Sequence, residues 1–284
     1  MAEFNTNETT LQEVVSQEIE LARRSASIAV GNSWNKVEGK IKKKGDTLNI
    51  LGLEDPETHD YDGNDISFSN IETTNNKIVI DKAKYIGKVI LDVDSDISQF
   101  NPLKDLSKKV GSVIGTEHDK YIYETIAKAY ANGSNQIIDA EGLTSLTTLS
   151  LLANAQAKLL EANIPEDEET VLEVSPSFQT KLLMAGIIHK TDNGEEFKNA
   201  YLGSFGKTKI MLSNNIYTDS GVQNIVLRSK KAYAFAQTIN KVEVVKTENN
   251  FGQKLKALTL YGGKIIRPKE IVVIKYTPGE ETTI

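Results

Sequence analysis

The stretch that decides the fold is NPLKDLSKKVGSVIGTEHDKYIYETIAKAYANG, residues 101–133. Asn101 followed by Pro102 is typical of a helix start, because Asn caps the first turn and Pro fits the first helical position. Apolar residues then recur at helical spacing as far as Tyr130, and Asn132-Gly133 ends the pattern. The sequence therefore predicts one helix of about 30 residues, which is roughly 45 Å long at 1.5 Å per residue.

This predicted helix is much longer than the average of about 12 residues, so it can serve as a spine for other elements. Gly111 and Gly115 lie inside it. Because glycine has low helix propensity, we expect the two residues to weaken the helix and to mark a bend.

A second helix is predicted upstream, from about residue 10 to 29. Thr10-Leu-Gln-Glu13 reads as a capping box, and apolar residues follow at helical spacing. The stretch after this helix is polar and begins with Gly31-Asn-Ser33. We therefore expect the apolar face of this helix to lack a partner nearby in the chain and to pack against another chain.

Residues 46–76 form a long segment with little periodicity and with no Lys or Arg. A loop of this length is uncommon inside a compact domain and is typical of a projecting functional arm or of disorder. Short apolar alternations at 48–51 and 66–69 predict the two legs of a long hairpin. Strand-like residues at 77–80 and 85–91 indicate that the arm returns to a sheet.

Downstream of Gly133 the pattern changes to helices alternating with strands. Helices are predicted at 146–162 and at 176–184, the second capped by Ser175, with a short strand at 170–174 between them. Further strands are predicted at 209–212, 224–227, 241–246, 255–261 and 271–276. This part of the chain is therefore a mixed α/β region that ends in strands.

Composition limits the kinds of site that the chain can carry. Among 284 residues there is no Cys, which excludes thiol nucleophiles, disulfides and zinc ribbons. We expect the three histidines, His59, His118 and His189, to be ordinary surface or boundary residues. The net charge of −6 has the wrong sign for a protein that mainly coats nucleic acid. No stretch approaches the roughly 18 apolar residues of a membrane span.

Two segments resemble known motifs but lack residues that the motifs require. Residues 201–208 end as a Walker A loop does, but Tyr201 stands at its first glycine position and a strand, not a helix, is predicted to follow. We expect a turn between strands there. Residues 92–96 open like a calcium loop, but Ile97 and Leu103 occupy positions that need Gly and Glu. The sequence therefore predicts no catalytic residue, no cofactor and no metal site.

Charge is strongly ordered in the first part of the chain. Residues 21–45 carry seven basic residues and one acidic residue, whereas residues 46–76 carry eight acidic residues and no basic one. These blocks are either solvated faces, or surfaces that pair between neighbouring copies, or, for the basic block, a strip that contacts phosphate. The candidate inter-subunit residues are Lys40, Lys42, Lys43, Lys44, Glu54, Asp55, Glu57, Asp60, Asp62 and Asp65.

The order of these elements resembles the major capsid proteins of tailed bacteriophages and prophages, which have the Hong Kong 97 fold. The shared order is an N-terminal amphipathic helix, a long hairpin arm, a spine helix, an α/β region and a return to strands. The local sequences that resemble the family are Lys77–Tyr85 followed by Asp92-Val-Asp94, Val174-Ser-Pro176, Leu202–Gly206 leading to Lys209–Ser213, Ala232–Ala236, and Leu260–Pro268. The resemblance as a whole spans about residues 10–276.

The resemblance implies an α+β fold with four parts. These are an N-terminal arm and basic stretch at 1–45, an extended β-hairpin loop at 46–86, a peripheral domain with the spine helix at 87–140 and 238–262, and an α/β axial domain at 141–237 and 263–284.

The same resemblance implies a structural protein without catalysis. Copies would assemble into pentamers and hexamers that form an icosahedral shell around double-stranded DNA. The expected partners are the chain itself, a separate scaffolding protein, a portal protein and packaged DNA held by non-specific contact, with no membrane. The expected location is the capsid of a virion, made in the cytoplasm of a bacterial host.

A separate scaffolding protein is expected because only about thirty residues precede the basic stretch, fewer than in family members with a built-in scaffolding segment. Two alternative functions stay open. One is an encapsulin, a bacterial shell of the same fold that encloses cargo enzymes. The more remote one is a nucleotide-binding enzyme that uses Gly206-Lys207-Thr208.

Overall fold

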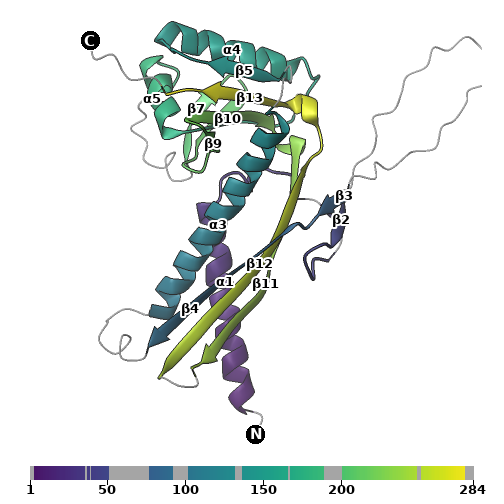
Figure 1. Cartoon of the computed structure of the whole chain (residues 1–284), viewed down its shortest axis with the longest axis vertical. Coiled ribbons are helices and arrows are strands. Elements are labelled where there is room, and N and C mark those ends of the chain that lie inside the picture. Colours follow the sequence, from purple (N-terminus) through teal and green to yellow (C-terminus); the bar gives the residue numbers. More distant parts are fainter. Residues whose placement is uncertain are drawn as a thin grey trace, which may run out of the picture.

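The computed structural model describes residues 3–35, 37–38, 40–50, 77–91, 102–131, 136–165, 167–188, 200–247 and 251–278. An α/β region occupies one end of the molecule, and a column of two long helices beside a three-stranded sheet extends from it (Figure 1). A small sheet lies at the side of this column. The helices are α1 (Glu3–Ala26), α3 (Pro102–Ala129), α4 (Ser145–Leu160) and α5 (Pro176–Met184).

The α/β region is built on a sheet with the strand order β5–β13–β10–β6–β8–β7, to which β9 adds by pairing with β10. β5 runs parallel to β13 and β6 runs parallel to β8, whereas the other pairs are antiparallel. The bounds of its strands are β5 (Ile137–Ala140), β6 (Thr170–Val174), β7 (Tyr201–Phe205), β8 (Thr208–Leu212), β9 (Thr218–Asp219), β10 (Val222–Ser229) and β13 (Ile271–Tyr276).

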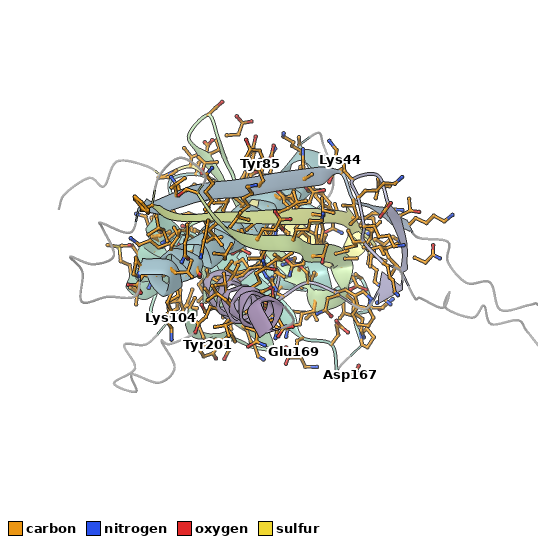
Figure 2. All side chains as sticks on the ribbon, turned by 90° about the horizontal axis from the view of Figure 1, so that it is seen from below. Lys44, Tyr85, Lys104, Asp167, Glu169 and Tyr201 are labelled. Carbon is orange, nitrogen blue, oxygen red and sulfur yellow. The ribbon has the colours of Figure 1, made fainter. Side chains whose placement is uncertain are left out.

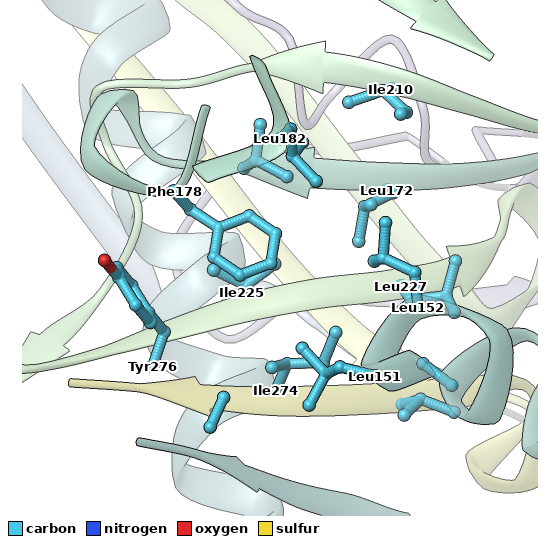
Figure 3. Packing of buried hydrophobic residues seen from close by; sticks show 14 of the residues in the cluster. Leu151, Leu152, Leu172, Phe178, Leu182, Ile210, Ile225, Leu227, Ile274 and Tyr276 are labelled. Atoms are coloured by element: carbon cyan, nitrogen blue, oxygen red, sulfur yellow. The ribbon is translucent and has the colours of Figure 1, made fainter. Parts of the chain in front are cut away.

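Both faces of this seven-stranded sheet are covered, because alternate residues of its central strands point to opposite sides. Ile225 and Leu227 of β10 pack with α4 and α5, and Figure 3 shows them facing Leu151 and Phe178 of these helices. Val226, between them in sequence, packs instead with the C-terminal half of α3. The spine helix therefore forms part of the core of the α/β region.

The column contains a three-stranded antiparallel sheet in the order β11–β12–β4. Its strands are β4 (Lys82–Leu91), β11 (Tyr233–Lys246) and β12 (Gly252–Ile265). Leu255 and Ala257 of β12 are buried against apolar residues of α1 and α3, such as Ile19 and Val110. One face of this sheet is thus covered by the two long helices.

The small sheet has the order β1–β2–β3, with β1 (Val37–Glu38), β2 (Thr47–Ile50) and β3 (Lys77–Val79). Leu48 and Ile78 of this sheet are buried against Ala236 of β11 and Leu260 of β12. Strands β2 and β3 flank the segment 51–76, which lies outside the described residues. The small sheet therefore fixes the root of the predicted arm.

Several predicted elements are confirmed. α3 begins at Pro102, α5 runs from Pro176 to Met184 with Ser175 as its N-cap, and β6 and β13 have the predicted bounds. The division into peripheral and axial domains stays a prediction.

Among the described residues, no helix is both long enough and apolar enough to cross a lipid bilayer.

The expectations for the first helix are wrong in two respects. α1 begins at Glu3, so Thr10 lies inside the helix and is not its cap. Its apolar face also has a partner in its own chain, because Val15 and Ile19 pack against α3. Local sequence reading missed this partner, since α3 lies about 90 residues further along the chain.

The two glycines of α3 have a different role from the one expected. A Cβ atom at Gly111 would lie 2.3 Å from the carbonyl oxygen of Ile19 and 2.7 Å from Cβ of Ala22. A Cβ atom at Gly115 would lie 2.8 Å from the carbonyl oxygen of Arg23. α3 continues through both positions, so the glycines allow α1 to approach closely.

Candidate assembly interface

The basic residues Lys40, Lys42, Lys43 and Lys44 lie between strands β1 and β2 of the small sheet, and all four are exposed. Asp46 holds this turn, because its Oδ2 atom accepts hydrogen bonds from the backbone N–H groups of Lys42 and Lys43 at 2.8 and 2.9 Å. These two bonds lower the pKa of Asp46. The turn therefore presents four like charges from a fixed backbone.

Contacts within the chain already occupy several charged residues of the two blocks, so fewer of them can contact another copy than the sequence indicates. Asp46, counted with the acidic block, already binds the basic turn of its own chain. Arg23 is buried and its Nε atom lies 3.0 Å from Glu20 Oε2, while Arg24 Nε lies 3.0 Å from Glu20 Oε1. Both arginines of the basic block are thus paired within α1.

The acidic half of the predicted contact lies outside the described residues. It comprises Glu54, Asp55, Glu57, Asp60, Asp62 and Asp65. The resemblance to a calcium loop at 92–96, together with His59 and His189, also lies outside them. Pairing between the acidic residues and the lysines therefore stays a prediction.

Strand β4 is an edge strand with an exposed side. Among the described strands it pairs with β12 alone, and Tyr85 and Val89 are 82% and 56% exposed. Figure 2 shows Tyr85 and Lys44 on the side of the molecule opposite to α1. β4 carries Lys82, Lys84 and Lys88 and no acidic residue, and lysines on an edge strand oppose pairing with another basic strand. This edge is suited to a partner with negative charge.

The register of the sheet shows which side chains share the face with Tyr85. Val89 stands beside Lys254, and Tyr85 stands beside Leu258. The residues next to these in sequence, Leu255 and Ala257, point toward the helices. The face of the sheet that points away from α1 and α3, here called the outer sheet face, thus has apolar residues among lysines, with Glu243 as an acidic exception. It comprises Tyr85, Val89, Lys241, Glu243, Val245, Lys254, Lys256 and Leu258.

A buried ion pair joins the α/β region to the segment after α1, and local sequence reading missed it. Arg228 of β10 and Glu173 of β6 are both fully buried, with Nε–Oε2 and Nη2–Oε1 distances of 3.1 and 3.0 Å. Arg228 also donates to Ser33 Oγ and to the carbonyl oxygen of Ala29, each at 3.0 Å, and Asn32 donates to Glu173 at 3.1 Å. The available signal was one ionisable residue inside each of two apolar strands.

Asp119 of α3 holds the end of α1 through three hydrogen bonds. Its carboxylate accepts from Ser27 Oγ at 2.7 Å and from the backbone N–H groups of Ile28 and Ala29 at 2.9 and 3.1 Å. Burial raises the pKa of Asp119 to about 6. This contact and the Arg228 pair fix the same segment from two sides.

His118 is buried between α3 and the three-stranded sheet, so the expectation of a surface or boundary residue is wrong. Its Nε2 atom lies 3.2 Å from Thr259 Oγ1, and its ring meets that of Tyr261 edge-on with centroids 4.5 Å apart. Burial lowers the pKa of His118 to about 3, which leaves the ring neutral at pH 7. The sheet that covers this side of α3 comes from distant sequence, so a local reading could not place it.

The turn expected at residues 201–208 is confirmed. Gly206 and Lys207 connect β7 to β8, and Gly206 has φ of +58°, which favours glycine. A strand follows, so no helix N-terminus faces a phosphate here. Among the residues that the structure describes, His, Asp and Glu form no group of three or more that could hold a metal ion.

No family model matches the sequence, and no curated protein matches it. Solved structures, in contrast, are similar over most of the chain. The structure described as Mycobacterium phage Che8 is 24% identical with a TM-score of 0.59, over 81% of this chain and 85% of the other. The capsid of Ralstonia phage GP4 is 13% identical with a TM-score of 0.64, over 85% and 86% of the two chains.

An encapsulin is also similar. The SrpI encapsulin complex from Synechococcus elongatus is 8% identical with a TM-score of 0.53, over 84% of each chain. At these identities the similarity establishes the fold. The chain therefore has the fold of phage major capsid proteins, the Hong Kong 97 fold.

Proposed function

We propose that this chain is the major structural protein of a phage or prophage capsid and has no enzymatic role. The observation that carries the proposal is the similarity to phage capsid subunits over more than four fifths of the chain. Copies assemble into pentamers and hexamers that form an icosahedral shell around double-stranded DNA. The protein is made in the host cytoplasm and ends in the virion.

Within such a capsomer, the chain has the parts that the resemblance implies. The parts at 87–140 and 238–262 lie at the periphery of each capsomer, and the parts at 141–237 and 263–284 lie at its centre. A scaffolding protein guides assembly, a portal protein occupies one vertex, and DNA contacts the shell non-specifically.

The acidic arm at 46–76, beyond its root at Asp46 and β2, is proposed to lie across a neighbouring copy. Its carboxylates at Glu54, Asp55, Glu57, Asp60, Asp62 and Asp65 would approach Lys40, Lys42, Lys43, Lys44 and the lysines of the outer sheet face. Charge complementarity supports this contact, because the arm has no basic residue and the outer sheet face carries three lysines and one acidic residue. Each exposed ion pair contributes only about 0.2–1 kcal/mol, but complementary charge fixes register and every subunit repeats the contact.

Electron microscopy of the purified chain, produced with and without its scaffolding protein, tests the shell. Closed particles or rings are expected, and a strict monomer across protein and salt concentrations would refute the proposal. The encapsulin alternative has a specific basis in the SrpI structure. Particles that hold a cargo enzyme and never acquire a portal or DNA would favour it.

Deleting residues 54–65 tests the arm. Circular dichroism should show a folded chain, since the root strands β2 and β3 remain, while negative-stain microscopy should show a large loss of shells. Reversing Asp60, Asp62 and Asp65 to Lys should weaken assembly most at low salt, because screening shortens electrostatic range. Normal shells from the deletion variant would contradict this role of the arm.

A further inference from the structure

The exposed faces of α3 and α4 differ in charge. The exposed positions of α3 include Lys104, Asp105, Lys108, Lys109 and Lys120, as expected of a helix face in water. The exposed positions of α4 carry no charge at all, and they are Ser145, Leu146, Thr147, Leu149, Ser150, Ala153, Asn154, Ala157 and Leu160. Leucines and alanines make up more than half of these positions, and the others are uncharged polar residues. α4 therefore lacks a partner on one face among the described residues.

The inner face of α4 is already fully used. Leu151, Leu152, Ala155 and Leu159 are buried against the seven-stranded sheet, and Figure 3 shows Leu151 and Leu152 directed into that core. Leu146, Leu149 and Leu160 on the other face are 75%, 42% and 50% exposed. These leucines cannot join the same core, because the helical repeat places them on another side of the helix.

The end of α5 extends this apolar surface. Ser145 Oγ donates a hydrogen bond to the carbonyl oxygen of Met184 at 3.2 Å, which holds the start of α4 beside the end of α5. Leu183 and Met184 are 39% and 58% exposed there. The α4 outer face, defined as Leu146, Leu149, Ser150, Ala153, Ala157, Leu160, Leu183 and Met184, thus has large residues at its ends and small ones in the middle. Small residues let another backbone approach closely.

We propose that the α4 outer face packs against a second copy of this chain within a ring of the shell; this inference rests on the proposed shell function. An uncharged face offers nothing to DNA or to the acidic arm, and in a shell the most abundant neighbour of each copy is another copy. Closed symmetric assemblies repeat one such contact around the ring.

The size of the part of the α4 outer face that lies on α4 itself fits a contact that forms only during assembly. Sixteen residues of helix present a strip about 24 Å long and about 10 Å wide, or about 240 Å². A stable pair of proteins buries about 800 Å² on each partner. The contact is therefore too small to hold a free dimer, so the chain stays dissociated until other contacts of the ring form beside it.

Single cysteines test this contact, because the chain has no Cys of its own. The variant Leu149→Cys is labelled with a fluorescent maleimide before and after assembly, and a photo-crosslinker on the same thiol is mapped by mass spectrometry. Labelling should slow at least tenfold in shells, and the crosslink should join two copies of the chain. Leu21→Cys on α1, where Leu21 is 64% exposed, is the control.

A second variant measures the effect on assembly. Leu146→Gln with Met184→Gln should leave the thermal unfolding of the chain unchanged and raise the concentration needed for assembly about tenfold. The control Leu21→Gln should not raise it. Shells in which the Leu149→Cys variant labels as fast as in the free chain, or crosslinks only to another protein, would overturn this inference alone. A chain that never forms shells would overturn the proposed function as well.

Discussion

The two larger sheets of this chain differ in how much of their surface the chain itself covers. The seven-stranded sheet is covered on one face by α4 and α5 and on the other by α3. The three-stranded sheet is covered by α1 and α3 on one face, while the described residues leave Tyr85 and Val89 exposed on the other. The first sheet supplies stability within one chain, and the second leaves a face and an edge available to other copies.

The difference extends to charged residues. In the seven-stranded sheet Arg228 and Glu173 are fully buried and paired with each other. On β4 the lysines remain near the surface, and Lys84, which forms an ion pair with Glu117, still has a side chain that is 53% exposed. Charge inside the first sheet is therefore part of its folding, whereas the charged residues of β4 remain in contact with solvent.

The largest expected effect comes from breaking the ion pair in the covered sheet. Arg228→Met leaves Glu173 as an unpaired buried charge. This should lower the free energy of unfolding, measured by urea denaturation, by about 3–5 kcal/mol. Lys209→Met is the control, because it breaks the exposed pair between Lys209 and Glu169 and should cost less than about 1 kcal/mol. Equal costs for the two variants would contradict the contrast between the sheets.

A smaller effect is expected at α3, the helix that packs against both of the larger sheets. Gly111→Ala adds a Cβ atom that would lie 2.3 Å from the backbone of Ile19, so α1 must move away. Overpacking of this kind costs about 1–3 kcal/mol, despite the better helix propensity of Ala. Thermal unfolding measures the loss, and the control is Ser112→Ala on the exposed side of α3. Stabilisation by Gly111→Ala would show that the two helices do not pack this closely.

The pH dependence of unfolding tests the burial of His118 under the covered face. Because its folded pKa of about 3 lies below the ordinary histidine value of 6.5, the unfolded chain binds this proton first as the pH falls. The neutral form of His118 therefore stabilises the folded chain fully above about pH 6.5, and this stabilisation is lost as the pH falls toward 3. By pH 5 the loss is about 2 kcal/mol.

His118→Gln removes this contribution, so between pH 7.5 and 5 the variant should lose about 2 kcal/mol less than the unmodified chain. Asp119 acts in the opposite direction, since its raised pKa stabilises the folded chain below the ordinary value of 3.8 and the benefit is lost as the pH rises through about 6. Asp119 is present in both proteins, so its contribution cancels in the comparison. The same pH dependence in both proteins would contradict a buried neutral His118.

The smallest effect on stability is expected on the outer sheet face. Tyr85→Thr should change the free energy of unfolding by less than about 0.5 kcal/mol, because Tyr85 is exposed and Thr, like Tyr, favours strands. Ile86→Thr is the matched control on the opposite face, where Ile86 packs with α1 and α3, and it should cost more than about 1 kcal/mol. Similar costs would mean that β4 does not separate the two faces as described.

Of the candidate site, the sequence predicted the basic stretch and not its internal contacts. Lys40, Lys42, Lys43 and Lys44 lie within five residues of one another, so their exposure could be expected from composition alone. That Asp46 binds this turn, and that Arg23 is buried beside Glu20, depends on how the backbone folds back on itself. Both findings reduce the charge that a neighbouring copy can contact.

Local sequence patterns were enough to define most individual elements of this protein. The spine helix, α5, β6 and β13 follow from caps, breakers and apolar spacing, and these signals act within a few residues. What these elements touch emerged only from their packing in three dimensions. The close approach at Gly111, the Arg228–Glu173 pair and the burial of His118 join residues that lie far apart in the chain. No local pattern encodes such contacts, because they exist only when separate elements pack into one body.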